Sequence, residues 1–193
     1  MTVESCDRPG QGIGLRPAKP EDLSDMVRLV DFMGEGPALQ FWRGQALPIE
    51  RAWQGQGLSG PPPLATSWRS AVIAEMEGEI AGLAVIAPLV EQDATARRLP
   101  GLVRPLQELE NLVPGSLCIH VLSVYPAYRH RSVARTLLGH VLGKSGGRDV
   151  SAICAAGNFP AIALLAGSGF QPRAVRPSEA GDYMLYLRAL GAG

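Results

Sequence analysis

The sequence predicts an α/β fold in which helices flank one mixed, mainly antiparallel sheet. Two apolar strand patterns, residues 71–76 and 80–86, are joined by Glu77-Gly78, which is typical of a tight hairpin turn. A further strand pattern, residues 118–124, leads through a basic loop into a helix pattern. Strand and helix patterns then alternate towards the C-terminus. This order of elements indicates one layered domain.

The length and composition fit a single globular domain. The chain has 193 residues, of which 46% are hydrophobic and 19% charged, so it can bury a sizeable core. Residues 1–12 contain no apolar run, and we expect a disordered tail there, followed by one domain over residues 13–190. This domain opens with a strand at 13–18. A helix follows from Pro20 to about residue 33, and its first turn is acidic.

The middle of the chain is less regular. Residues 34–69 are rich in glycine, proline and tryptophan, and we expect only a short helix near residues 37–45. Residues 102–112 carry leucines at helical spacing, which predicts a helix. This helix places Glu108 and Glu110 shortly before the central strand.

The segment at residues 118–142 is the most informative. Its apolar strand ends at a Tyr-Pro turn, and the loop Arg129-His130-Arg131 opens directly onto a helix. The first amides of a helix have no intrahelical partner, and the helix dipole and the arginines favour negative charge. We therefore expect an anion site with a phosphorylated cofactor as its natural ligand. Neither a G-x-G-x-x-G nor a G-K-[ST] motif is present, so it is not a Rossmann or Walker loop.

A second strand and helix follow this segment. Residues 151–155 form a short apolar strand pattern, and Asn158 is a suitable N-cap for the next helix. Gly169 is expected to end that helix. Two more strands are predicted at residues 170–176 and 182–190.

Two motifs in these segments resemble those of the GNAT family of N-acetyltransferases. The family's pyrophosphate loop, Q/R-x-x-G-x-G/A, is matched by Arg129-x-x-Ser132-x-Ala134. Its segment N-x-x-A-x-x-L-Y-x-x-x-G-F is matched by Asn158-x-x-Ala161-x-x-Leu164-Leu165-x-x-x-Gly169-Phe170. The resemblance covers about residues 13–190. It implies the GNAT fold, in which the strand ending near Val124 and the strand at 151–155 run parallel and splay apart, with pantetheine in the cleft between them.

The resemblance implies an acyltransferase (EC 2.3.1.-) that uses acetyl-CoA as a co-substrate. Backbone groups of the central strand would meet the pantetheine and the thioester, and loop amides would hold the pyrophosphate. The expected cofactor-binding residues are Leu122, Ser123, Val124, Arg129, His130, Arg131, Ser132, Val133, Ala134 and Asn158. Ser132 stands where the family usually has glycine. Its Cβ could crowd a phosphate, or its hydroxyl could donate to one.

His120 is the candidate catalytic residue. Side chains alternate along a strand, so we expect Cys118 and His120 to share one face with Leu122. The stretch resembles the strand of arylalkylamine N-acetyltransferases, which carries two histidines at the positions of Cys118 and His120. An imidazole near its ordinary pKa of about 6.5 could take a proton from an amine. The alternative is a half-buried structural histidine, and Cys118 is expected to be an apolar filler.

The general acid is where the chain departs most from the family. The tyrosine that protonates the leaving thiolate falls at Leu165, which can donate nothing. Tyr183 or a water is an alternative donor. The expected function is direct acetyl transfer to a primary amine, with a small molecule as the preferred acceptor class. The alternative function is a catalytically weak acyl-CoA-binding or sensor protein.

Weaker signals concern the acceptor. Trp42 could line its pocket, with a place in the core as the alternative. Glu108 and Glu110 could bind a cationic amine, with a solvated helix face as the favoured alternative.

Composition excludes several other classes of partner and site. The formal net charge is zero, which argues against a nucleic-acid partner, and the longest apolar stretch is too short for a membrane span. Three cysteines without C-x-x-C and three histidines without paired spacing predict no metal site. No signal-peptide pattern opens the chain, so we expect a cytoplasmic protein. The sequence is compatible with a homodimer.

Overall fold

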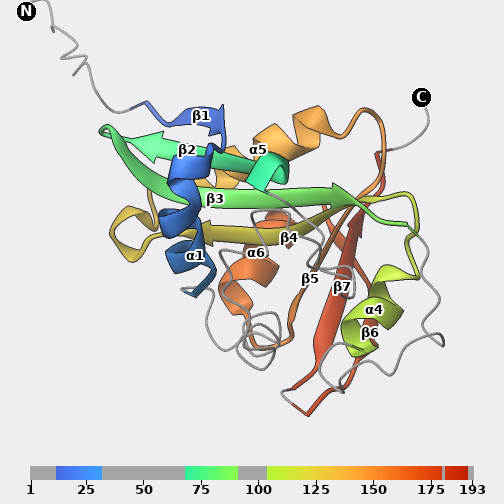
Figure 1. The fold of residues 1–193 in the computed structure, drawn as a ribbon. Coiled ribbons are helices and arrows are strands. Elements are labelled where there is room, and N and C mark those ends of the chain that lie inside the picture. Colours follow the sequence, from blue (N-terminus) through green and yellow to red (C-terminus); the bar gives the residue numbers. More distant parts are fainter. Residues whose placement is uncertain (1–11, 32–67, 91–103, 180, 191–193) are drawn as a thin grey trace, which may run out of the picture.

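The structure is a computed structural model that describes residues 12–31, 68–90, 104–179 and 181–190. Seven strands form one sheet in the order β1-β2-β3-β4-β5-β7-β6 (Figure 1). The strands are β1 (Gly14–Pro17), β2 (Ala71–Met76), β3 (Glu79–Pro88), β4 (Leu117–Val124), β5 (Val150–Ala155), β6 (Gln171–Arg176) and β7 (Tyr183–Arg188). The helices are α1 (Leu23–Asp31), α4 (Arg104–Glu110), α5 (Val133–Lys144) and α6 (Phe159–Gly167), with 3-10 turns η1 (Pro20–Asp22), η3 (Trp68–Ser70) and η4 (Pro126–Tyr128).

The predicted sheet is confirmed. Five of the six neighbouring strand pairs are antiparallel, and β4 and β5 are the parallel pair. Glu77 and Gly78 both have positive φ, 58° and 83°, as the tight turn between β2 and β3 requires. Most predicted boundaries agree to within two residues. The predicted tail at 1–12, apart from Gly12, and the predicted helix at 37–45 lie outside the described residues.

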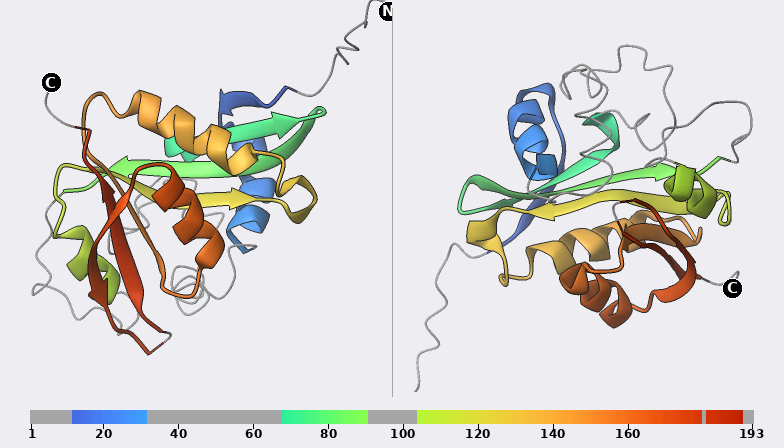
Figure 2. Two further views of the ribbon diagram at one scale, coloured as in Figure 1. Left: turned by 180° about the vertical axis from the view of Figure 1, so that it is seen from behind. Right: turned by 90° about the horizontal axis from the view of Figure 1, so that it is seen from below.

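Helices cover both faces of the sheet (Figure 2). Helices α5 and α6 lie on one face, where Leu137, Leu138 and Leu165 enter the largest apolar cluster. Helix α1 covers the other face through Met26 and Leu29. Helix α4 lies on this second face as well, further along the sheet, and packs on β6 and β7. Within the described ranges, no helix is long and apolar enough to cross a membrane.

The parallel pair is short. Strands β4 and β5 pair over three positions, Leu117 with Val150, Cys118 with Ser151 and Ile119 with Ala152. Beyond Ile119, β4 stays paired with β3, while β5 stays paired with β7. The two strands therefore part in the middle of the sheet, as expected from the GNAT resemblance.

A β-bulge lies where the strands part. Val85 of β3 pairs with Val121, and the next residue, Ile86, pairs with Ile119, so His120 is the additional residue. The bulge resets the alternation of side chains. Ile119 packs in the cluster under α5 and Val121 packs in the cluster under α1, although the two residues are two positions apart.

The bulge makes one expectation wrong. Leu122 does not share a face with Cys118 and His120, because it packs in the cluster under α5. Cys118 and His120 do share a face, and their donor atoms approach Glu110 of α4 on the opposite side of the sheet. A two-residue period cannot reveal an inserted residue, so the alternation rule failed at this point.

Close packing of β3 against β4 depends on Gly82. A Cβ atom at this position would lie 2.8 Å from the carbonyl oxygen of Ser123, 3.1 Å from Val133 and 3.2 Å from Leu137. A backbone oxygen held in a central strand cannot move aside as the end of a side chain can. Glycine at this position therefore allows β4 and α5 to approach β3.

We predict that Gly82→Ala lowers the free energy of unfolding by about 1–3 kcal/mol, because it overpacks this junction. The matched control is Gly139→Ala in the exposed face of α5, where an added Cβ meets nothing within 4 Å. This control should raise stability by up to about 1 kcal/mol through helix propensity. Urea unfolding of both variants measures the difference, and equal effects would contradict the packing argument.

Candidate active site

The loop between β4 and α5 presents free backbone amides. His130 and Ser132 both adopt positive φ, 60° and 65°, and α5 begins directly afterwards. The carbonyl oxygen of Ser132 accepts from the amide of Thr136 at 2.9 Å. In the part of the chain that the structure describes, the amides of residues 133–135 have no acceptor. They form the start of a helix of 12 residues, where the dipole favours an anion.

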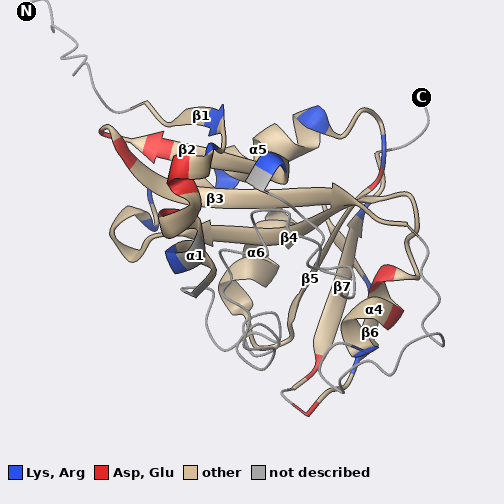
Figure 3. Cartoon of the chain, viewed as in Figure 1, with Lys and Arg blue, Asp and Glu red and all other residues tan. Residues whose placement is uncertain are grey.

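The side chains of this loop are partly engaged elsewhere. Arg131 forms an ion pair with Glu77 in the hairpin turn and stacks over the ring of Tyr128, 5.7 Å from its centroid. The Nε of Arg129 makes a long contact of 3.4 Å with the carbonyl oxygen of Val124. Acidic residues lie at the β2–β3 turn, where Glu77 pairs with Arg131, and on α4 (Figure 3). Arg131 is therefore held by the fold, which leaves the backbone amides at the start of α5 as the candidate donors to an anion.

Ser132 occupies a backbone conformation that suits glycine. Its left-handed conformation costs a residue with a Cβ roughly 1–2 kcal/mol. Its side chain is exposed and makes no capping hydrogen bond within α5. Its hydroxyl is therefore available to a ligand at the helix start.

The end of β4 offers backbone groups along the edge that faces β5. The side chains of Leu122 and Val124 pack in the cluster under α5. The Ser123 side chain is buried, and its hydroxyl donates to the carbonyl oxygen of Leu29 at 2.6 Å. All three side chains are used by the fold. A ligand between the parted strands would meet the main chain of this segment.

Asn158 has the predicted capping role. Its Oδ1 accepts from the amide of Ala161 at 3.2 Å at the start of α6. Gly169 has a φ of 84° immediately after this helix and its C-cap, as predicted for a helix end. The amide nitrogen of the Asn158 side chain is not needed for the cap.

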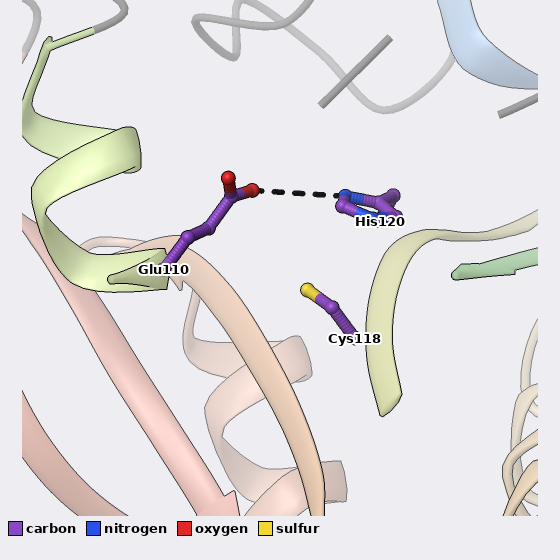
Figure 4. Close-up of side chains that lie close together, drawn as sticks. All are labelled: Glu110, Cys118 and His120. Atoms are coloured by element: carbon purple, nitrogen blue, oxygen red, sulfur yellow. Dashed lines mark ion pairs between the residues drawn. The ribbon is translucent and has the colours of Figure 1, made fainter. Parts of the chain in front are cut away.

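Three side chains with lone pairs meet on the second face of the sheet. Glu110 ends α4, while Cys118 and His120 project from β4 towards it (Figure 4). The His120 Nδ1 atom lies 3.8 Å from the Glu110 Oε1 atom, and the two side chains are 8% and 7% exposed. One donor atom of each of the three residues lies within 4.8 Å of the others, which is close enough for all three to approach one metal ion. We call Glu110, Cys118 and His120 the buried trio.

Burial shifts the pKa of each member of the trio towards its neutral form. It raises the pKa of Glu110 from 4.5 to about 7. It lowers the pKa of His120 from 6.5 to about 4. It raises the pKa of the Cys118 thiol, and the nearby Glu110 charge adds to that effect. The expected imidazole pKa near 6.5 is therefore wrong for His120, which is neutral at pH 7.

The two glutamates of α4 have different environments. Glu108 is 42% exposed, and its Oε2 atom pairs with the Nε of Arg176 at 3.2 Å. Glu110 is buried, so the expectation of a solvated helix face is wrong for it. The sequence did contain a signal, because Leu106, Leu109, Glu110 and Val113 follow the i, i+3, i+4, i+7 spacing of a buried helix face. Trp42 lies outside the described residues.

No hydroxyl stands at the position of the family's tyrosine. Leu165 is 4% exposed and packs in the same cluster as Phe170 and Tyr186. The hydroxyl of Tyr183 is hydrogen-bonded with the Ser178 side chain. The hydroxyl of Tyr125 donates to the Asp25 Oδ1 atom at 2.7 Å. Among the described residues, neither tyrosine presents an unoccupied hydroxyl.

Comparisons with known proteins agree with this architecture. Residues 42–170 match the model of the "Acetyltransferase (GNAT) family". No curated protein sequence is significantly similar to the chain. Solved structures with the same fold include the ribosomal-protein-S18-alanine N-acetyltransferase from Escherichia coli, with 16% identity and a TM-score of 0.59 over 94% of this chain and 96% of that chain.

Two further structures have the same fold. An N-acetyltransferase from Staphylococcus aureus Mu50 has 17% identity and a TM-score of 0.58 over 91% of this chain and 100% of that chain. The yncA protein from Salmonella typhimurium, whose structure was determined with its cofactor acetyl-CoA, has 15% identity and a TM-score of 0.56 over 94% of this chain and 96% of that chain. The family match spans more than half of the 193 residues, and the chain belongs to the GNAT acetyltransferase family.

Proposed function

We propose that this protein is an acetyl-CoA-dependent N-acetyltransferase, that residues 13–190 form its single catalytic domain, and that its acceptor is a primary amine of a small molecule. The observation that carries the proposal is the parting of β4 and β5 beside the free amides at the start of α5. An extended chain fits beside an unpaired strand edge, and a pyrophosphate fits a helix start. Acetyl-CoA contains both groups.

The residues present fit this ligand. The main chain of Leu122, Ser123 and Val124 would hold the pantetheine and the acetyl carbonyl. The amides of residues 130–134 would hold the pyrophosphate, and the Ser132 hydroxyl would add one donor. The Arg129 amide, expected to belong to this set, instead donates to the carbonyl oxygen of Pro126 at 3.3 Å. The Asn158 amide nitrogen, at the start of α6, would face the same cleft. When bound, acetyl-CoA supplies an acetyl group activated as a thioester.

The buried trio supplies the proton chemistry of the proposal. An amine attacks only as the free base, so its ammonium form must lose a proton. His120 lies at the bulge where the strands part, and its imidazole is neutral at pH 7, with a lone pair available. Within the described ranges, Leu165 offers no proton and the hydroxyls of Tyr125 and Tyr183 are engaged, so none of these three residues is assigned the role of protonating the leaving thiolate. With a pKa of about 8.5, as for cysteine, a thiolate can leave unassisted at neutral pH.

A second function is favoured by Leu165. The replacement of the family's tyrosine by a buried core leucine removes an acid that is worth about 10²–10⁴ in rate. A catalytically weak acyl-CoA-binding or sensor protein would tolerate this loss. The two functions differ in transfer, not in binding.

The first prediction of this proposal concerns cofactor binding. Acetyl-CoA should raise the melting temperature of the protein, and less so at high salt, because charge contributes to the binding. Ser132→Ala removes one hydrogen bond and should weaken binding about 3–10-fold. Ser132→Asp should abolish the thermal shift, since its carboxylate would occupy the amides and repel the phosphates.

The matched control for that experiment is Ser24→Asp. It adds the same charge in the first turn of another helix, α1, at an exposed position. The acetyl-CoA shift of this variant should equal that of the wild type. No shift of the wild type at millimolar acetyl-CoA would contradict cofactor binding, and equal shifts for both aspartate variants would place the phosphates elsewhere.

The second prediction concerns transfer. Release of the CoA thiol should accelerate with at least one amine among phenethylamine, spermidine and a peptide with an N-terminal alanine. The peptide is included because one protein of the same fold, from Escherichia coli, is the ribosomal-protein-S18-alanine N-acetyltransferase. The mass of the product should rise by one acetyl group. Saturable acetyl-CoA binding without transfer to any of the three would instead support the sensor function.

A further inference from the structure

We infer that Glu110 and His120 act together as one base, in which His120 takes the proton of the acceptor ammonium and passes its other proton to Glu110. The inference rests on the proposed function. It changes the role of Glu110 from a surface carboxylate that attracts a cation to the terminal proton acceptor of the site.

The backbone brings the two groups together from two elements. Glu110 is the last residue of α4 and lies over β4. The bulge in β4 places His120 beside the point where β4 and β5 part. The Nδ1 atom faces the carboxylate at 3.8 Å, which is longer than a hydrogen bond but close enough to be closed by a small side-chain rotation. Within the described part of the chain, neither group forms a hydrogen bond.

Two largely buried side chains, 8% and 7% exposed, thus keep lone pairs that no hydrogen bond between described residues uses. A carboxylate or an imidazole that is over nine-tenths buried normally has a hydrogen-bond partner. Here each group has the other as the polar neighbour towards which it points (Figure 4). A proton shared in a direct hydrogen bond would satisfy both. The pair is therefore built for proton exchange between its members.

The order of proton affinities sets the direction of transfer. The pKa of Glu110 is raised to about 7 and that of His120 is lowered to about 4, both by burial. An extra proton placed on the pair is therefore more stable on the carboxylate. The remaining titratable neighbour is Cys118, whose pKa is raised, so it stays a neutral thiol. Among the described residues, no charged group on α1, β5, β6 or β7 shifts the pKa of Glu110.

The proton relay ends with a neutral imidazole, and each bond that breaks is matched by one that forms. The N–H bond of the ammonium breaks, and a bond forms between that proton and the His120 Nε2 atom. The Nδ1–H bond breaks, and its proton bonds to the Glu110 Oε1 atom. The amine is then free to attack, His120 is the opposite neutral tautomer, and Glu110 is a neutral carboxylic acid. A histidine that is a weak base alone can therefore serve in a relay.

The first test reads the pair without any substrate. In the full-length protein, ¹⁵N-histidine signals should show His120 neutral from pH 8 down to about pH 5, with its proton on Nδ1. One ¹³C-glutamate carboxyl signal should titrate near pH 7, and it should be missing in Glu110→Gln. A doubly protonated His120 at neutral pH beside a Glu110 that ionises below pH 5 would overturn the inference.

The second test separates proton transfer from substrate binding. The rate should fall below about pH 7 in the wild type, because Glu110 must be ionised to accept the proton. Glu110→Gln should lower kcat about 10²-fold and remove that acidic limb, with little change in the amine KM or in acetyl-CoA affinity. Glu79→Gln, which changes an exposed carboxylate at the start of β3, is the control and should match the wild type.

The outcomes separate three explanations. If Glu110→Gln raises the amine KM and leaves kcat and its pH limb intact, Glu110 binds the ammonium and the inference fails. If the protein as purified holds one equivalent of zinc that Cys118→Ser loses, an ion uses these lone pairs and the inference also fails. A wild type that does not bind acetyl-CoA would refute the proposed function instead, and the spectra would still report the state of the pair.

Discussion

The short parallel pairing of β4 with β5, over only three residue pairs, determines how the site of this molecule is arranged. Strands β4 and β5 pair from Leu117 to Ile119 and then separate, because β4 stays with β3 and β5 stays with β7. The helices that follow these strands, α5 and α6, both return to the same face. Gly82 permits the close contact of β3 with β4 beside the point where β4 leaves β5. The separation of β4 from β5 is thus a consequence of strand pairing, and His120 lies at that point.

On the second face of the sheet, two ionisable side chains are buried at a cost in free energy. A hydrophobic residue at position 110 would complete the apolar face of α4 at no desolvation cost. The chain instead buries a carboxyl group beside an imidazole, and both lose stability in their charged forms. Groups with such opposed shifts are typical of sites that move protons. Stability alone does not account for Glu110.

Local chemistry was readable in the sequence, while irregular geometry was not. The Glu77-Gly78 turn, the Asn158 cap and the helix from Val133 follow from residue types at fixed positions, and each is present. The bulge at His120 depends on how β3 and β4 register against each other, so the face of Leu122 could not be read from alternation. The helical spacing of Glu110 with Leu106 and Leu109 indicated a buried position, but the charge of a glutamate favoured the prediction of a solvent-exposed one.

The ion pair between Arg131 and Glu77 has a consequence for the entropy of binding. Together with the stacking of Arg131 on Tyr128, it ties the cationic loop to the hairpin turn of another part of the sheet. An exposed pair of this kind adds little to stability, about 0–1 kcal/mol. It does restrict the loop in the folded chain itself, so the loop conformation that we propose binds an anion is established when the chain folds. The arginine can therefore promote affinity without touching the ligand, by pre-organisation.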